Sequence, residues 1–70
     1  MSETIRVVVN GQEREIDHSS TGLDLLRALE LDPRTVVVEL NREIVRRQSL
    51  SETMLSDGDC IEIVHFVGGG

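Results

Sequence analysis

Only one segment of this chain has leucines at helical spacing, and the other apolar runs have the period or composition of β-strands. The helical segment runs from Gly22 to about Leu31, and Pro33 prevents its continuation. Thr21 can cap this helix, and Asp24 three residues later completes a weak capping-box signature. One helix among several strands is expected to cover one face of a sheet.

The first strands are predicted from a period of two. Positions 5, 7 and 9 are all isoleucine or valine, which is the spacing of a half-buried strand. Asn10-Gly11 follows and favours a hairpin, because both residue types tolerate positive φ. Residues 12–17 form a weaker returning strand, in which Ile16 is the main apolar anchor.

The second half of the chain contains three further strand-like segments. Residues 35–40 are β-branched and apolar, which is typical of a buried strand. The later elements are a turn at Asn41-Arg42, a short strand at 43–46, a helical turn within 49–55, a turn at 57–59 and a last strand at 60–67. The complete order is ββαβββ, which predicts an α+β domain with a mixed sheet packed on one helix.

Size and charge limit the functions that are open to this chain. Its 70 residues make one domain, predicted at 1–67, and the core is too small to enclose a large ligand pocket. The net charge of −6 would repel nucleic acid, and no apolar run approaches the length of a membrane span. Cys60 is the only cysteine, so a reducing cytoplasm is the expected location. We therefore expect neither nucleic acid nor a membrane among its partners.

One face of the predicted sheet carries apolar residues that the helix would not cover. If Ile61 and Ile63 face the helix, the same alternation turns other apolar residues outward. An exposed apolar patch is typical of a docking surface, and scattered surface residues or an inward-tucked Phe66 are the alternatives. The predicted partner-binding surface consists of Val8, Val37, Val64 and Phe66.

The sequence closes on three glycines, Gly68, Gly69 and Gly70. Glycine loses the most backbone freedom on folding, so residues 68–70 are expected to form a thin, flexible tail. Such a tail can enter a cleft in which any Cβ would clash, and it presents the Gly70 carboxylate. The alternative is a frayed end or linker without a function.

No catalytic or metal site of the chain's own is evident. Cys60 has no histidine at a recognisable catalytic spacing, and a strand cysteine is usually a small apolar residue. His18 and His65 are too few for a dedicated zinc site. Asp57 and Asp59 flank Gly58 and are interpreted as turn residues. We expect no intrinsic catalytic residue, no metal and no bound cofactor.

Several short motifs together resemble a known family. They are Val9-Asn10-Gly11, Leu25-Leu26, the run VELNREIV at 38–45, Asp57-Gly58-Asp59 and the ending IVHFVGGG at 63–70. In this order they resemble ubiquitin-like β-grasp sulfur carrier proteins of thiamine biosynthesis, the ThiS-like members of the MoaD/ThiS superfamily. Two departures, Arg46 in place of a proline and Leu50 in place of a larger residue, are expected to affect local packing only.

The resemblance implies a protein co-substrate and not an enzyme. In the family, a ThiF-like adenylating enzyme similar to ubiquitin-activating enzymes uses ATP to adenylate the terminal glycine, here Gly70. Sulfur that comes from cysteine, often by way of a cysteine desulfurase, displaces AMP and leaves a thiocarboxylate. Thiazole synthase then takes this sulfur into the thiazole ring. Gly68 and Gly69 would thread into the partner.

Two alternatives to thiamine biosynthesis stay open at this point. The small subunit of molybdopterin synthase uses the same fold and a terminal thiocarboxylate to deliver sulfur to the molybdenum cofactor. A ubiquitin-like modifier or interaction module would join its C-terminus to a lysine or leave it unused. The short length and the VHFVGGG ending favour the thiamine pathway.

Overall fold

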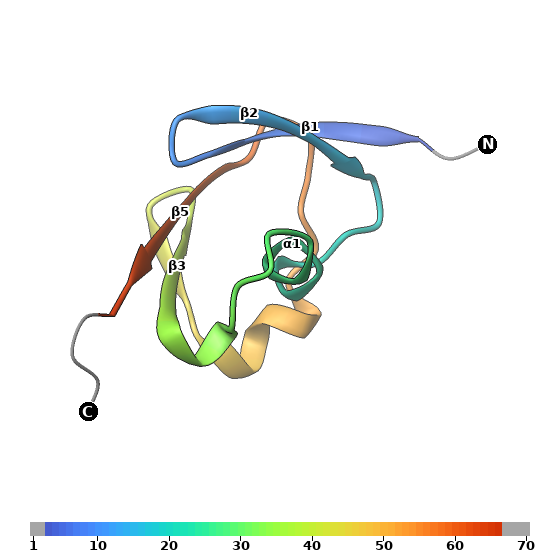
Figure 1. The fold of residues 1–70 in the computed structure, drawn as a ribbon. Coiled ribbons are helices and arrows are strands. Elements are labelled where there is room, and N and C mark those ends of the chain that lie inside the picture. Colours follow the sequence, from blue (N-terminus) through green and yellow to red (C-terminus); the bar gives the residue numbers. More distant parts are fainter. Residues whose placement is uncertain (1–2, 67–70) are drawn as a thin grey trace.

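The computed structural model describes residues 3–66, and the glycines at 68–70 lie outside the described residues. Five strands form one mixed sheet in the order β2-β1-β5-β3-β4, with one helix packed against it (Figure 1). The elements are β1 (Thr4–Val9), β2 (Gln12–Asp17), α1 (Gly22–Ala28), β3 (Val36–Leu40), β4 (Glu43–Val45) and β5 (Cys60–His65). The predicted ββαβββ order and two-layer α+β architecture are confirmed.

Both hairpins turn through residues with positive φ. Asn10 and Gly11 have φ of 51° and 83°, and they join β1 to β2 as predicted. Asn41 and Arg42 have φ of 51° and 74°, and they join β3 to β4. Two successive residues with positive φ twist the chain in the sense that a tight hairpin requires.

The helix begins as predicted but ends earlier. The Thr21 hydroxyl accepts a hydrogen bond from the Asp24 N–H at 3.1 Å, and the Asp24 carboxylate accepts one from the Thr21 N–H at 3.0 Å. These bonds lower the pKa of Asp24. The expected end at Leu31 is wrong, because α1 stops at Ala28 and Glu30 takes a φ of 61°. The Leu31 N–H returns to the Leu26 carbonyl at 2.9 Å, which closes the helix before Pro33.

The last strand and the connections shift by a few residues from their predicted bounds. β5 ends at His65, and Val67, where the strand was expected to end, lies outside the described residues. The helical turn is a 3-10 helix at Arg47–Glu52, and a second one at Pro33–Thr35 precedes β3. Arg46 has a φ of −65°, an angle that proline also adopts, so the local backbone is compatible with either residue.

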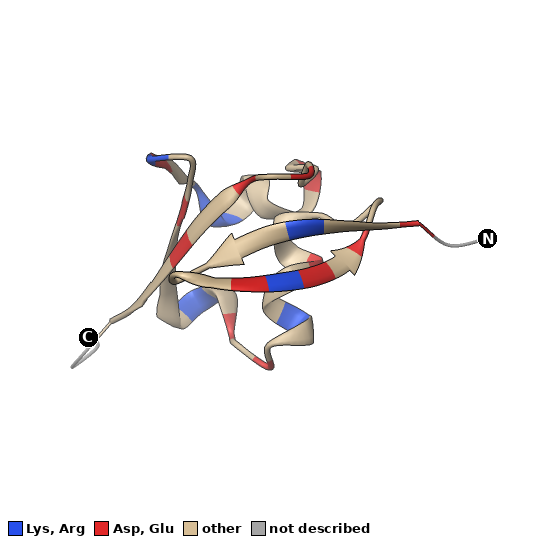
Figure 2. Cartoon of the chain, turned by 90° about the horizontal axis from the view of Figure 1, so that it is seen from above, with Lys and Arg blue, Asp and Glu red and all other residues tan. Residues whose placement is uncertain are grey.

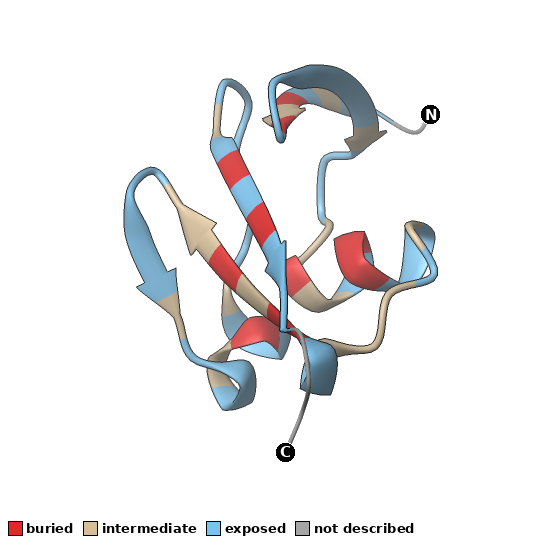
Figure 3. Ribbon diagram, turned by 60° about the vertical axis from the view of Figure 1, so that its left-hand side comes forward, coloured by how far each residue is buried: buried red, intermediate tan, exposed pale blue. Residues whose placement is uncertain are grey.

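The core lies between α1 and one face of the sheet (Figure 3). Leu50 reaches it from the Arg47–Glu52 turn and is only 2% exposed. This turn packs closely on the start of the helix, since a Cβ added to Gly22 would lie 3.0 Å from Leu50 Cδ2. The buried apolar residues are Val7, Val9, Leu25, Leu26, Val36, Val38, Leu50, Leu55, Ile61 and Ile63.

Within residues 3–66, no helix is long and apolar enough to cross a membrane.

Candidate functional site

The strand that leads to the glycines lies in the interior of the sheet. β5 pairs with β1 in parallel and with β3 in antiparallel orientation (Figure 1). Pairing with β3 continues to His65, and the Phe66 N–H donates to the Thr35 carbonyl at 2.9 Å. The chain is therefore held by β3, and by Thr35 immediately before it, up to the last residue that the structure describes. Gly68, Gly69 and Gly70, the predicted reacting segment, lie beyond it.

Three of the four predicted docking residues lie together on the face that α1 leaves uncovered. Ile61 and Ile63 are buried against the core as predicted, so Val64 points to the opposite face, and it is 61% exposed. Val37 lies directly across from Val64 in the β3–β5 ladder. Phe66 is 58% exposed and borders the same hollow as Val37.

Val8 lies apart from the other three. It pairs with Cys60 at the beginning of β5, four residues before Val64. Four strand residues correspond to roughly 13 Å along the sheet. The intervening position holds Glu62, which lies opposite Glu39 of β3. Two carboxylates therefore separate Val8 from the apolar residues near the end of β5.

The structure adds one residue that the sequence interpretation did not include. Ile44 of β4 lies opposite Glu39 and is 68% exposed, the largest exposed fraction of any bulky apolar residue in the described part of the chain. It lines a shallow hollow of about 250 Å³ together with Val37 and Phe66. Val45 packs inward, so alternation turns Ile44 outward, but a strand of three residues does not show in the sequence which of the two faces the core. We call Val37, Ile44, Val64 and Phe66 the terminal apolar patch.

Arginines border the terminal apolar patch, although the chain as a whole is acidic. Arg34, Arg46 and Arg47 line the same hollow. Arg34 is bound to Asp32 at 2.9 Å, and this guanidinium lowers the pKa of the Asp32 carboxyl. At the opposite edge of the sheet, β1 and β2 carry both positive and negative side chains (Figure 2). Two of them, Arg6 and Glu13, form an exposed ion pair at 3.9 Å.

The two turn aspartates bind the backbone, as the turn interpretation predicts. Asp57 accepts a hydrogen bond from the Arg6 N–H at 2.8 Å, and Asp59 accepts one from the Ser56 N–H at 2.8 Å. Asp59 also accepts a hydrogen bond from the side-chain amide of Asn41 at 3.0 Å. These carboxylates therefore hold in place the turn that precedes β5.

The other polar candidates do not converge. Cys60 is exposed at the start of β5, His65 is at its end, and His18 is in the loop after β2. Among residues 3–66, no three His, Cys, Asp or Glu side chains form a group that could hold a metal ion.

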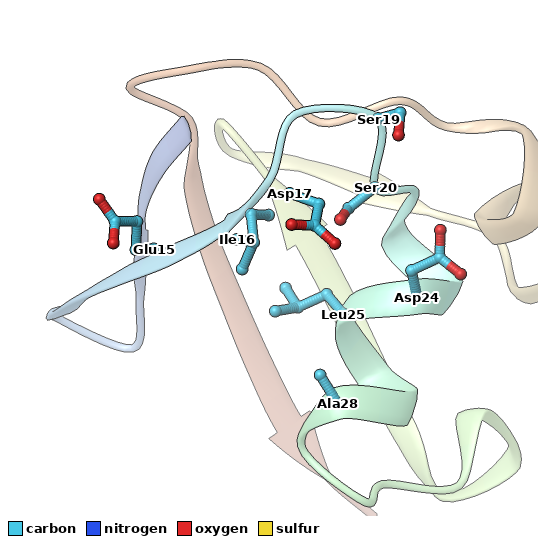
Figure 4. Close-up of a pocket in the computed structure, with 8 residues that line it drawn as sticks. All are labelled: Glu15, Ile16, Asp17, Ser19, Ser20, Asp24, Leu25 and Ala28. Carbon is cyan, nitrogen blue, oxygen red and sulfur yellow. The ribbon is translucent and has the colours of Figure 1, made fainter. Parts of the chain in front are cut away.

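A second hollow lies on the helix side of the sheet, between β2 and α1 (Figure 4). Its volume is about 520 Å³. Ile16, Leu25 and Ala28 supply its apolar lining, and the carboxylates of Asp17 and Asp24 lie at its border. It contains none of the predicted site residues and lies on the face opposite to the terminal apolar patch.

Comparison with known proteins gives a consistent result. The model of the ThiS family matches residues 7–70, which include all three terminal glycines. The sulfur carrier protein ThiS of Bacillus subtilis is 51% identical over 47 residues, which cover 67% of this chain and 71% of that protein. The thiazole synthase of Paramagnetospirillum magneticum is 46% identical over 66 residues, 94% of this chain. This chain spans only 20% of that thiazole synthase.

Solved structures agree with the sequence relatives. The crystal structure of the thiamine biosynthesis protein ThiS from Geobacter metallireducens superimposes with a TM-score of 0.81 at 36% identity, covering 94% of this chain and 100% of that one. The ubiquitin of Caldiarchaeum subterraneum has a TM-score of 0.55 at 18% identity over the whole of both chains, which confirms the ubiquitin-like fold. The fold, the terminal motif and the family match together show that this chain belongs to the ThiS family.

Proposed function

We propose that this protein is the sulfur carrier that supplies sulfur for thiazole formation in thiamine biosynthesis, with Gly70 as the residue that carries the sulfur. The family match to residues 7–70 carries this proposal, because it extends through the glycines. The named relatives, a sulfur carrier, a thiazole synthase and a thiamine biosynthesis protein, all belong to this one process. The likeness to the ubiquitin of Caldiarchaeum subterraneum, at 18% identity, concerns the fold alone and gives no support to a role as a protein modifier.

The chemistry requires activation of the Gly70 carboxylate, because a carboxylate is a poor electrophile. One carboxylate oxygen attacks the α-phosphorus of ATP, the bond to the β-phosphate breaks, and pyrophosphate leaves. A sulfur nucleophile, hydrosulfide in the simplest case, then attacks the acyl carbon, and AMP leaves with the bridging oxygen. Loss of the remaining proton gives the thiocarboxylate. ATP is thus a substrate of the activating enzyme and not a cofactor of this protein.

The length of residues 67–70 limits how far the globular part can lie from the ATP that the adenylating enzyme binds. Residues 67–70 can span at most about 14 Å from Phe66. The terminal apolar patch lies at the end of β5 and includes Phe66 itself. A partner that binds Gly70 in its active site must therefore contact this patch or its immediate surroundings.

The terminal apolar patch is the proposed docking surface for a ThiF-like adenylating enzyme and for thiazole synthase. Ordering a glycine tail in a cleft reduces its entropy and opposes binding, so the folded part must supply contact energy. Val64, Phe66 and Ile44 offer exposed apolar area for this contact. The thiazole synthase of Paramagnetospirillum magneticum contains a region similar to this chain. Joining two proteins in one chain raises their effective concentration for each other, so this arrangement supports thiazole synthase as a partner.

Thiocarboxylate formation tests the proposal directly. The protein, ATP, sulfide and a ThiF-like adenylating enzyme are incubated together, and intact mass is measured. The expected result is replacement of one oxygen by sulfur, located at Gly70 by fragmentation. A variant extended by one alanine after Gly70 is the matched control and should remain unmodified. Lysine-linked conjugates without thiocarboxylate would contradict sulfur carriage and favour a modifier.

The docking surface gives a second prediction. Phe66→Ala should raise the KM of the adenylating enzyme for this protein about tenfold, because an exposed aromatic anchor contributes on the order of 1–2 kcal/mol to binding. Met54→Ala is the matched control, since Met54 is 57% exposed and Phe66 is 58% exposed. It should leave KM unchanged. Equal effects of the two variants on KM would exclude the terminal apolar patch as the docking surface.

A further inference from the structure

β5 loses its neighbour on one side before it reaches its end. β1 pairs with it only at Val8–Cys60 and Val9–Ile61, after which the first hairpin turns away at Asn10. On the other side, β3 continues to pair as far as His65. The part of β5 that leads to the tail therefore has a backbone neighbour on one side only.

The side chain of Asn10 takes the place of the missing neighbour. Its Oδ1 accepts a hydrogen bond from the Ile63 N–H at 2.8 Å, and its Nδ2 donates to the Ile63 carbonyl at 3.2 Å. The Asn10 backbone N–H donates to the Ile61 carbonyl at 2.9 Å. Asn10 thus continues the ladder by two residues with a side-chain amide, which has the same donor and acceptor as a peptide group.

The position of this contact matters for the tail. Even-numbered residues of β5 direct their backbone groups toward β3, as the bonds at Cys60 and Phe66 show. Odd-numbered residues face the β1 side, where Ile61 and Ile63 are both held by Asn10. Within residues 3–66, Ile63 is the last residue that is hydrogen-bonded on this side.

We propose that Asn10 is a positioning residue for the reaction at Gly70. By fixing both backbone groups of Ile63, it sets the direction in which the end of β5 leaves the sheet, and it holds Val64 and Phe66 in place for docking. This inference rests on the proposed function. Without the two hydrogen bonds from the Asn10 side chain, the end of β5 is held from the β3 side only. More conformational freedom of the chain must then be lost when residues 67–70 enter the nucleotide site of the adenylating enzyme. Small errors in the placement of a reacting group reduce rates strongly.

Asn41 provides a matched comparison within the same molecule. It has the same φ of 51° and occupies the equivalent place in the second hairpin. Its side chain also forms two hydrogen bonds, accepting from the Cys60 N–H at 2.9 Å and donating to Asp59 at 3.0 Å. These bonds hold the beginning of β5, at the end remote from the tail. Replacing either asparagine with glycine is compatible with the positive φ, removes the side-chain bonds and adds the same backbone freedom at both positions.

The test compares Asn10→Gly with Asn41→Gly in ATP–pyrophosphate exchange catalysed by a ThiF-like adenylating enzyme. Both variants are expected to lose some stability, and both are assayed at a temperature at which melting curves show them folded. We expect kcat/KM for Asn10→Gly to fall about tenfold or more, whereas Asn41→Gly stays within about twofold of the unmodified protein. Amide hydrogen exchange at Ile63 should accelerate in Asn10→Gly only.

Three other outcomes are informative. Equal kcat/KM values for the two variants, whether both lowered or both unchanged, would overturn the positioning role. If Asn10→Gly does not fold, Asn10→Asp replaces it, because Asp accepts from the Ile63 N–H but cannot donate to the Ile63 carbonyl, and a reduced kcat/KM is again expected. Absence of ATP–pyrophosphate exchange with the unmodified protein would refute the proposed function itself. Failure of the proposed function is thus distinguished from failure of the positioning role of Asn10.

Discussion

Gly69→Val is expected to slow ATP–pyrophosphate exchange about 100-fold while leaving the melting temperature unchanged. The reason is steric, since a β-branched side chain would widen the segment that must thread into the cleft of the adenylating enzyme. The hydrophobic core is formed within residues 3–66, so a change at position 69 removes no core contact that the structure describes. Initial exchange rates and thermal melts on the same preparation provide the two measurements.

Gly22→Ala is the matched control with the opposite expectation. A Cβ at Gly22 would lie 3.0 Å from Leu50 Cδ2, which is tight for a buried contact, so stability should fall. ATP–pyrophosphate exchange by the folded fraction should be unchanged, because Gly22 packs on Leu50 in the core and does not line the hollow at the terminal apolar patch. Unaltered exchange for Gly69→Val would contradict the threading argument, and a lowered melting temperature would show that the tail contributes to the fold.

Leu50→Ala is expected to have the largest effect on stability. Leu50 is 2% exposed and connects the Arg47–Glu52 turn to the helix. Truncation of a buried leucine costs about 2–5 kcal/mol, whereas a domain of this size has a total stability of roughly 4–10 kcal/mol. A substantial fraction of the variant should therefore be unfolded at physiological temperature. Urea unfolding followed by circular dichroism measures the change.

Met54→Ala again serves as the control, because Met54 is 57% exposed and follows the same turn. It should change the free energy of unfolding by less than about 0.5 kcal/mol. If Leu50→Ala has a similarly small effect, the Arg47–Glu52 turn is not an integral part of the core. Docking to the adenylating enzyme and adenylation of the fraction that remains folded should be unaffected.

The fold was predictable because its signals are local. Alternation at positions 5, 7 and 9, the Asn10-Gly11 turn and the capping box at Thr21 each act within a few residues. The early end of α1 was missed because Glu30 adopts a positive φ that is more typical of glycine or asparagine. The helix end is closed by local hydrogen bonds, from the Glu30 N–H to the Arg27 carbonyl and from the Leu31 N–H to the Leu26 carbonyl, and the residue type at position 30 does not indicate it.

The candidate site was only partly predictable, because it depends on strand register. Alternation correctly directed Val37 and Val64 away from the helix, but only the register shows that Val8 lies beside Cys60 instead. Ile44 was missed because a strand of three residues is too short to show a period. The contact between Asn10 and Ile63 joins residues 53 positions apart, and no local pattern indicates it.

The central place of β5 also has a consequence for synthesis of the protein. The β1–β2 hairpin and the β3–β4 hairpin pair with each other only through β5, which is synthesised after the other four strands of this sheet. Most of the sheet's long-range pairing therefore forms after translation of residue 65, and a prematurely terminated chain has an incomplete core.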